Sequence, residues 1–346
     1  MTGNLIGTAL VTGAAGFIGS ALTRALLDVG GRVIAVDNLV NGTAENLAGL
    51  GLDHLRFEQA DIRDRARIEA LLPGVDVIYH LACLGVRHSI HSPRENHDVN
   101  ATGTLDLLVM ARAAGVGRFV YVSSSEVYGT ARAAPMTETH PTFPMTVYGA
   151  GKLAGECYAR GYWETYGYPT VMVRPFNAFG PRCHHEGDSG EVIPKFMLRA
   201  MAGQPLFVFG DGEQTRDFTY VEDTARGILA AGHAADAIGR TINLGSGAEV
   251  TINVLAGMIS NLVAGGRAEV RYEPPRPGDV LRLIADAREA EIRLAFAPQV
   301  SLQDGLKALH AWYLMEGHSP VEMLRDEIAH NWRGDVKAEA SNGRSD

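Results

Sequence analysis

Cysteine is scarce in this chain, and long hydrophobic runs are missing. Its 346 residues include only three cysteines, Cys83, Cys157 and Cys183, which are widely spaced and form no CxxC pair. This usage fits a reducing cytoplasm better than a disulfide framework. No apolar stretch approaches the roughly 20 residues that span a bilayer, and no basic segment precedes the apolar part of the N-terminus. We therefore expect a cytoplasmic protein without a membrane partner.

Positive charge is also in short supply. Lys and Arg number 31 against 40 Asp and Glu, which gives a net charge of −9 without any basic run. Nucleic acid is therefore not an expected partner. The histidines of "CHHEG" are adjacent and lack the spacing that wraps a tetrahedral ion, so no metal is expected. The apolar fraction of 46% is that of an ordinary globular protein with an ample core.

The first half of the chain alternates short apolar runs with stretches of helical spacing. The apolar runs predict strands at Thr8–Thr12, Arg32–Val36, Leu55–Gln59, Val75–His80, Phe119–Ser123 and Thr170–Arg174. Helical spacing is found at Ile18–Val29, Ala66–Leu72, Ala101–Ala114 and Tyr148–Tyr166. Such alternation predicts right-handed βαβ units and an α/β fold of the Rossmann type, a doubly wound parallel sheet with helices on both faces.

The pattern changes after Arg174. The segment "RPFNAFGPRCHHEGDSGE" is rich in Pro, Gly, Asn and His, which predicts a long loop. The elements predicted after it are a helix at Val192–Met201, a strand at Leu206–Phe209, a helix at Val221–Ala231, a strand at Thr241–Leu244 and a helical region at Leu302–Leu314. We expect a smaller, interleaved α/β substrate domain over residues 176–330, with part of 210–245 returning to the domain formed by residues 1–175. The chain from Asp335 onward is small and polar, and residues 331–346 are expected to form a disordered tail.

A glycine pattern follows the first predicted strand. "LVTGAAGFIGS" places Gly13, Gly16 and Gly19 between that strand and the next helix, as a dinucleotide-binding turn requires. Asp37 ends the second strand, 18 residues after Gly19. A carboxylate there accepts both ribose hydroxyls and repels a 2′-phosphate, so the domain over 1–175 is predicted to bind NAD rather than NADP. Asp61 is expected either to contact adenine or to cap the helix that follows it.

A Tyr-Lys pair follows in "VYGAGK". Tyr148 and Lys152 are four residues apart and so share one face of a helix. Tyr148 lies 24 residues after Ser124. A neighbouring ammonium and a positive nicotinamide ring would both favour the tyrosinate. We therefore expect Tyr148 to act as a base toward a substrate hydroxyl and Lys152 to hold the nicotinamide ribose.

Taken together, these motifs make the sequence similar to the extended short-chain dehydrogenase/reductases, in the branch of NAD-dependent nucleotide-sugar epimerases and dehydratases. The resemblance runs from about residue 8 to 315 and rests on TGAAGFIG, the Asp-Asn at Asp37, the serines before VYG, YGAGK, RPFNAFGPR, GDGEQTRDFTYVEDTARG, and RPGD at 276–279. It implies tightly held NAD that is reduced and reoxidised in one turnover, a nucleotide-diphosphate sugar substrate, and a 4-keto intermediate. It also implies a homodimer built through helices near 101–114 and 148–166.

The resemblance also implies roles for individual residues. Ser124 hydrogen-bonds the C4 oxygen beside Tyr148, Arg216 and Arg276 clamp the diphosphate, and Val192 covers the nucleotide base. The implied cofactor-binding residues are Gly13, Gly16, Phe17, Ile18, Gly19, Asp37, Asn38, Asp61, Ile62, Leu81, Ala82, Tyr148, Lys152 and Pro175. The implied substrate-binding residues are Ser125, Asn177, Val192, Arg216, Arg276 and Asp279.

Glu126 distinguishes between the reactions of this family. A 4,6-dehydratase needs a base to remove the C5 proton once C4 is a ketone, and a carboxylate suits that task. Dehydratases of thymidine-linked glucose carry Thr-Asp-Glu at this point, whereas this chain has Ser124-Ser125-Glu126 and lacks the Asp that serves as their acid. Relatives acting on GDP-mannose carry a similar Ser/Thr-Ser-Glu. The hypothesis is therefore a 4,6-dehydratase with catalytic residues Ser124, Glu126, Tyr148 and Lys152.

Three alternatives remain open from the sequence. A 4-epimerase needs no further acid, and the RPGD motif is frequent among epimerases. UDP-glucuronate decarboxylases carry Thr-Ser-Glu and would need a cation near the C6 carboxylate, for which Arg87 and Arg182 are candidates. The most remote alternative is a non-catalytic NAD-sensing protein, although this chain keeps Ser124, Tyr148 and Lys152.

Overall fold

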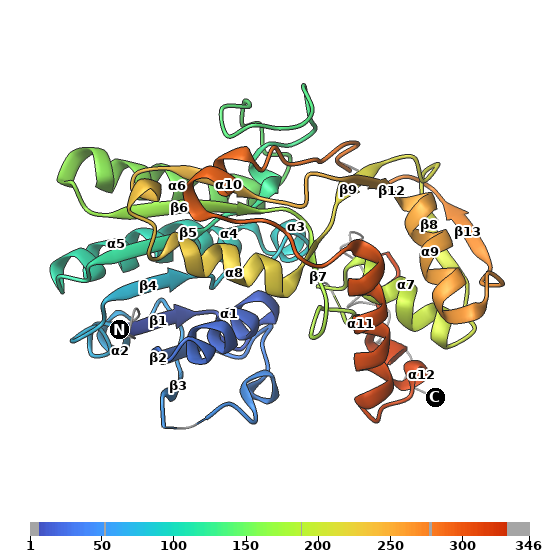
Figure 1. Ribbon diagram of the computed structural model, residues 1–346, viewed down its shortest axis with the longest axis horizontal. Helices are drawn as coiled ribbons and strands as arrows, with labels where there is room; N and C mark the ends of the chain where they lie inside the picture. Colours follow the sequence, from blue (N-terminus) through green and yellow to red (C-terminus); the bar gives the residue numbers. More distant parts are fainter. Residues whose placement is uncertain (1–6, 52, 188, 277–278, 331–346) are drawn as a thin grey trace, which may run out of the picture.

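The chain is built around a seven-stranded parallel sheet (Figure 1). The computed structural model describes residues 7–51, 53–187, 189–276 and 279–330, so the tail predicted at 331–346 lies outside the described residues. The strands are β1 (Thr8–Thr12), β2 (Arg32–Asp37), β3 (Leu55–Gln59), β4 (Val77–His80), β5 (Arg118–Val122), β6 (Thr170–Pro175) and β11 (Thr241–Leu244). Their spatial order is β11-β6-β5-β4-β1-β2-β3, and every neighbouring pair is parallel.

Helices cover both faces of this sheet, which confirms the predicted doubly wound architecture. On one face lie α1 (Phe17–Asp28), α8 (Val221–Ala231) and α10 (Arg288–Leu294), which share a buried core with the strands. The other face is covered by α2 (Arg65–Glu69), α5 (Thr104–Ala113) and α6 (Val147–Tyr166) around a second core. The strands and helices predicted here are present, with ends that shift by up to three residues. For example, β4 begins at Val77 because the Val75 N–H is still bonded back to the Leu72 carbonyl, 3.0 Å away, in a turn.

The helix predicted at Ala101–Ala114 begins differently from the prediction. Two short helices, α3 (His88–His91) and α4 (Pro93–His97), lead into a π-helical segment, Asp98–Gly103, before α5. The Asn100 side chain donates to the Leu84 carbonyl at 2.9 Å and accepts from the Leu84 N–H at 2.9 Å. These bonds hold the loop after β4 against the π-helical turn, a feature that often accompanies functional sites.

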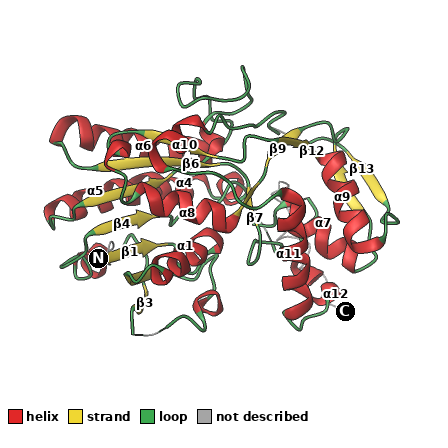
Figure 2. Cartoon of the chain, viewed as in Figure 1, coloured by secondary structure: helices red, strands yellow, loops and turns green. Residues whose placement is uncertain are grey.

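The second layer is smaller and packs beside the sheet, as Figure 2 shows on the right. It contains α7 (Val192–Met201), α9 (Ile252–Ala264), α11 (Leu302–Met315) and α12 (Pro320–Met323) around the parallel pair β8 (Leu206–Phe209) and β13 (Val270–Glu273). Two short pairs complete it: β7 (Ala178–Phe179) with β10 (Thr219–Tyr220), and β9 (Thr215–Asp217) with β12 (Glu249–Thr251). The short single-turn helices are Ala44–Leu47, Ser125–Val127, Ala235–Ala237 and Leu324–Asp326.

The sequence predicted only part of this layer. The helix α9 and strand β13 were not predicted, and β7 lies inside the segment predicted as a loop. Strands of two to four residues are too short for an alternating pattern to show. In the described part of the chain, no helix is long and apolar enough to cross a membrane.

A buried ion pair ties α6 to the sheet. The Arg174 guanidinium on β6 donates to both carboxylate oxygens of Glu156, at 2.8 and 2.5 Å, and both side chains are almost fully excluded from solvent. Arg174 also donates to the Tyr128 hydroxyl at 2.7 Å, and that hydroxyl donates to Asn243 Oδ1 on β11 at 2.7 Å. This network links the helix that carries Tyr148 to two neighbouring strands.

Removing one partner of this pair should destabilise the fold strongly. Because Glu156→Ala would leave the Arg174 charge buried and unpaired, we expect the free energy of unfolding to fall by about 3–5 kcal/mol. Chemical denaturation followed by circular dichroism measures this change. Glu269→Ala, which breaks an exposed pair with Arg271, is the control and should have a far smaller effect. Equal losses in the two variants would contradict the role of the buried pair.

Candidate functional site

A single groove of about 570 Å³ runs along the carboxyl edge of the sheet and continues to the second layer. Parallel strands end at the same edge, so the loops that follow them meet there. Every residue predicted for the site lines this groove: Gly13, Gly16, Phe17, Ile18, Gly19, Asp37, Asn38, Asp61, Ile62, Leu81, Ala82, Ser124, Ser125, Glu126, Tyr148, Lys152, Pro175, Asn177, Val192, Arg216, Arg276 and Asp279.

At one end of the groove, two glycines at the turn between β1 and α1 are packed too tightly to carry a side chain. Gly13 has a φ of 72°, and a Cβ there would lie 2.7 Å from the Ala82 backbone nitrogen. A Cβ on Gly19 would lie only 1.9 Å from the Gly13 carbonyl oxygen. The glycines therefore let the backbone turn sharply and leave the N-terminal N–H groups of α1 facing the groove, where a pyrophosphate would bind.

Two carboxylates border this end. Asp37 accepts from the Ala15 N–H at 2.9 Å and from the Leu39 N–H at 2.8 Å, which orients it at the end of β2. Asp61 accepts from Arg63 Nε at 2.9 Å and from Asn38 Nδ2 at 2.9 Å. Hydrogen bonds from Arg63 hold the pKa of Asp61 well below its usual range. Asp61 does not cap the following helix.

The cap of α2 is instead Asp64, which accepts from the Arg67 N–H at 3.1 Å. The Asp61 carboxylate lines the groove beside Asn38, and its contact with adenine stays a prediction. The arrangement of glycines, helix N-terminus and Asp37 fits the pyrophosphate and ribose of a dinucleotide.

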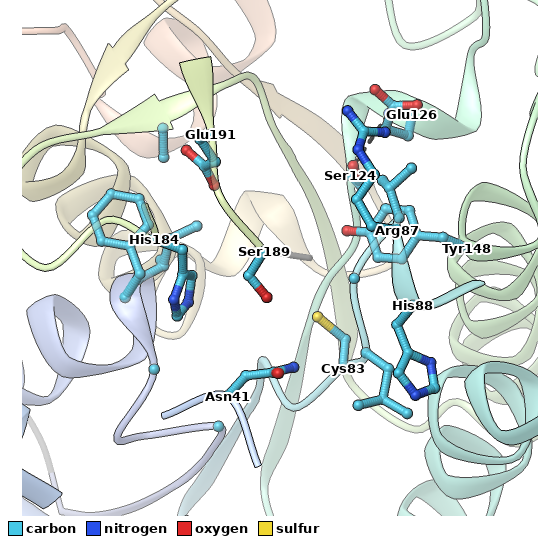
Figure 3. A pocket seen from close by; sticks show the side chains of 18 of the residues that line it. Asn41, Cys83, Arg87, His88, Ser124, Glu126, Tyr148, His184, Ser189 and Glu191 are labelled. Carbon is cyan, nitrogen blue, oxygen red and sulfur yellow. Dashed lines mark hydrogen bonds between the residues drawn. The ribbon is translucent and has the colours of Figure 1, made fainter. Parts of the chain in front are cut away.

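Ser124 and Tyr148 lie together at the groove (Figure 3), and Lys152 lines it as well. Ser124 follows β5, and its hydroxyl hydrogen-bonds the Tyr148 side chain. Thr146 caps α6 by accepting from the Gly149 N–H at 3.1 Å, which fixes where the helix begins and hence where Tyr148 points. Lys152, one turn further along, is buried and donates to the Val122 carbonyl at 2.7 Å.

In the protein by itself the pKa of the Tyr148 hydroxyl is raised, and the tyrosinate expected beside a bound nicotinamide stays a prediction. Burial raises the pKa of the Tyr148 hydroxyl, and the nearby charges of Cys83, Glu126 and Glu191 raise it further, against the hydrogen bond with Ser124. Burial also lowers the pKa of Lys152. The low dielectric of the site disfavours both charged forms, so the positive charge that would favour tyrosinate has to come from a bound cation.

Glu126 lies on the short helix Ser125–Val127, on the same side of the groove as Ser124. Burial raises the pKa of its carboxyl, whereas the charges of Arg216 and Arg87 oppose this shift. Arg87 therefore lies within electrostatic range of Glu126. Arg182, the other candidate cation from the sequence, lines a separate cavity between α1 and α8.

Three guanidinium groups gather at the substrate end. Burial and the charges of Arg87 and Arg216 lower the pKa of Arg276 to about 10. Arg216 donates to Asp279 Oδ1 at 2.7 Å and to the Val280 carbonyl at 2.6 Å, so Asp279 orients Arg216. Crowded cations of this kind are stabilised by an anion, and a diphosphate suits their geometry.

Several lining residues were not predicted from the sequence. They include Ser123, His184, Ser189, Glu191, Phe209 and Phe218, whereas Arg87 was named only as a candidate cation for a decarboxylase. Glu191 immediately precedes α7. Burial raises the pKa of its carboxyl group to about 7; the charges of His184 and Arg87 oppose this shift, and the charge of Glu186 adds to it. Its only sequence signal was its place at the end of a long loop next to Val192, since functional residues are common in such loops.

Residues 9–245 match the profile of the NAD dependent epimerase/dehydratase family. The chain belongs to this family. It is 39% identical to the UDP-glucose 4-epimerase of Mycolicibacterium smegmatis over 302 residues, which covers 86% of this chain and 95% of that protein. The UDP-glucuronic acid decarboxylase 1 of Xenopus tropicalis is 34% identical over 309 residues, which covers 87% of this chain and 71% of that one.

A crystal structure of the dTDP-glucose 4,6-dehydratase of Streptomyces venezuelae with NAD bound superposes with a TM-score of 0.84. Its sequence is 36% identical to this one, and the match covers 89% of this chain and 97% of that one. The protein is therefore an NAD-dependent member of the nucleotide-sugar epimerases and dehydratases.

A methyl group at Gly19 should weaken NAD binding. Because a Cβ would collide with the Gly13 carbonyl, Gly19→Ala must deform the turn that faces the pyrophosphate. We expect NAD affinity to fall at least about tenfold, measured by calorimetry and by the NAD released from purified protein. In the control Gly257→Ala, the new methyl enters open space on α9. Unchanged affinity in Gly19→Ala would contradict the assignment of this turn.

Proposed function

We propose that this protein is a 4,6-dehydratase that converts a nucleotide-diphosphate hexose into its 4-keto-6-deoxy derivative. The observation that carries the proposal is the place of Glu126. Its carboxylate lines the groove on the same side as Ser124 and Tyr148, within electrostatic range of Arg87 and Arg216. A pure 4-epimerase has no need of a carboxylate at this point.

The first step is oxidation at C4. Bound NAD supplies the hydride acceptor for C4 and the donor that later reduces C6. Tyr148 takes the proton of the C4 hydroxyl, and Ser124 holds that oxygen through its own hydroxyl. Lys152, on the same helix as Tyr148 and held by the Val122 carbonyl, would hold the nicotinamide ribose through its ammonium group.

The second step is removal of the C5 proton. The C4 ketone makes this proton acidic, and Glu126 accepts it. Burial raises the pKa of Glu126, which makes the carboxylate a stronger base, and the charges of Arg216 and Arg87 oppose this shift by favouring the ionised form. Arg216 and Arg276 bind the diphosphate, and Val192 and Asn177 border the substrate end of the groove.

A 4-epimerase is the second candidate. It is supported by the name of the Mycolicibacterium relative at 39% identity and by Arg276 and Asp279 of the RPGD motif, whose Pro277 and Gly278 lie outside the described residues. In that case the keto sugar would rotate within the groove between its oxidation and its reduction, and Glu126 would only orient the sugar. A decarboxylase would use Arg87 as the cation beside the C6 carboxylate, because Arg182 lines the other cavity.

The product mass decides between these reactions. The purified protein is incubated with UDP-glucose, dTDP-glucose, GDP-mannose and UDP-glucuronic acid, and we expect one hexose product to lose about 18 Da, the mass of water. Glu126→Gln should still form NADH but lose deuterium exchange at C5 and water loss. A product of unchanged mass would indicate the epimerase, and loss of carbon dioxide would indicate the decarboxylase.

The Tyr148→Phe variant tests whether the site catalyses oxidation of a substrate at all. Removing the proton acceptor should lower NADH formation on the bound cofactor at least about 100-fold, while NAD stays bound. Tyr166→Phe, at an exposed position near the end of the same helix, is the matched control and should keep full activity. If Tyr148→Phe behaved like this control, the oxidation mechanism would be wrong and a sensing role would gain support.

A further inference from the structure

Two carboxylates face the reacting part of the groove from different layers of the molecule. Glu126 stands on the short helix that follows β5, whereas Glu191 stands at the N-terminus of α7 in the second layer. In Figure 3, Glu191 and Ser189 lie on the wall opposite Ser124 and Tyr148, with the groove between them. A sugar placed against Tyr148 would therefore have a carboxyl group on each side.

Both carboxylates act electrostatically on the same tyrosine. The charges of Glu126 and Glu191 each raise the pKa of the Tyr148 hydroxyl, so both lie within electrostatic range of the group that holds the C4 oxygen. Glu191 is accessible from the groove but lies deep within it, where the surrounding protein limits the water around its carboxyl group. These observations place two titratable acids around one substrate position.

The dehydration also needs a general acid, and Glu126 cannot serve as that acid. Hydroxide is a poor leaving group, so the C6 oxygen must receive a proton as its bond to carbon breaks, while Glu126 is occupied in removing the C5 proton. Ser125 stands next to Glu126 and is buried, but a neutral hydroxyl is a much weaker acid than a carboxyl group. Asp279 also lines the substrate half of the groove, but its carboxylate is paired with Arg216 and so is not suited to be the acid.

The surroundings of Glu191 suit an acid. Burial raises its pKa to about 7, with His184 and Arg87 opposing the shift and Glu186 reinforcing it. The Cys183 thiol, the Tyr148 hydroxyl and the Tyr313 hydroxyl also lie within its electrostatic range. A carboxyl group with this pKa is partly protonated at neutral pH and can release its proton readily, which is the condition for efficient general acid catalysis.

We propose that Glu191 is the general acid that protonates the departing C6 hydroxyl while Glu126 removes the C5 proton. This inference rests on the dehydratase function proposed above. The C5–H electron pair becomes the C5=C6 double bond, the C6–O pair leaves with the oxygen, and the proton from Glu191 completes a water molecule. Glu126 gains one proton and Glu191 loses one. The reduction of C6 that follows uses the two electrons removed from C4, so the overall reaction is the loss of one water.

The test separates oxidation, proton removal and water loss in Glu191→Gln. The NAD-loaded protein is mixed with UDP-glucose, dTDP-glucose or GDP-mannose in deuterated water. NADH absorbance then reports oxidation, C5 deuterium reports proton removal, and product mass reports water loss. We expect oxidation and exchange to stay within about threefold of wild type, and water loss to fall about 100-fold.

A pH profile gives an independent readout. Because Glu191 must carry its proton to act as the acid, wild-type water loss should decline as the pH rises through about 7, the pKa of Glu191. In Glu191→Gln this alkaline decline should disappear. Glu222→Gln is the matched control, since Glu222 lies in the first turn of α8 and lines the other cavity, and it should behave as wild type.

The outcomes are distinct. Water loss at the wild-type rate in Glu191→Gln would overturn the proposal. Simultaneous loss of NADH formation would also overturn it, because Glu191 would then act in substrate binding or oxidation. A wild-type protein that forms NADH but releases no water would refute the dehydratase function, and the role of Glu191 would fall with it.

Discussion

The parallel orientation of all seven strands is the constraint on which the rest of the structure depends. Because every strand of the sheet runs the same way, the turn after β1, Asp37 at the end of β2, Leu81 after β4 and Ser124 after β5 meet at one edge. This edge forms one wall of the groove, and the second layer forms the other. Residues that are more than 100 positions apart in the sequence thereby line the same groove.

Exclusion of water is the second organising effect, and it shifts four titratable groups around the reacting part of the groove toward their neutral forms. It raises the pKa values of Tyr148, Glu126 and Glu191 and lowers that of Lys152, so each group is held toward its neutral form. The arginines at the substrate end oppose this effect for Glu126. A site of this kind becomes fully charged only when ligands bring their own charges, namely a cationic nicotinamide and an anionic diphosphate.

The buried network of Arg174, Glu156, Tyr128 and Asn243 connects this chemistry to the scaffold. It locks α6 against β6 and β11, while the Thr146 cap sets the start of the same helix. The position of Tyr148 relative to Ser124 is therefore determined by contacts on several elements. Rigid support of this sort is what a proton transfer over a single hydrogen bond requires.

The sequence by itself determined the features that depend on local pattern. Alternating strands and helices predicted the parallel sheet, the spacing of Gly13, Gly16 and Gly19 predicted the dinucleotide turn, and the four-residue interval predicted that Tyr148 and Lys152 share a face. Only the tertiary structure decided that Glu191 and Arg87 enter the same groove as Glu126, that Arg182 does not, and that Asp279 orients Arg216. The reason is physical: a period or a turn is encoded by neighbouring residues, whereas a shared cavity and a pKa depend on how distant segments pack and how much water they exclude.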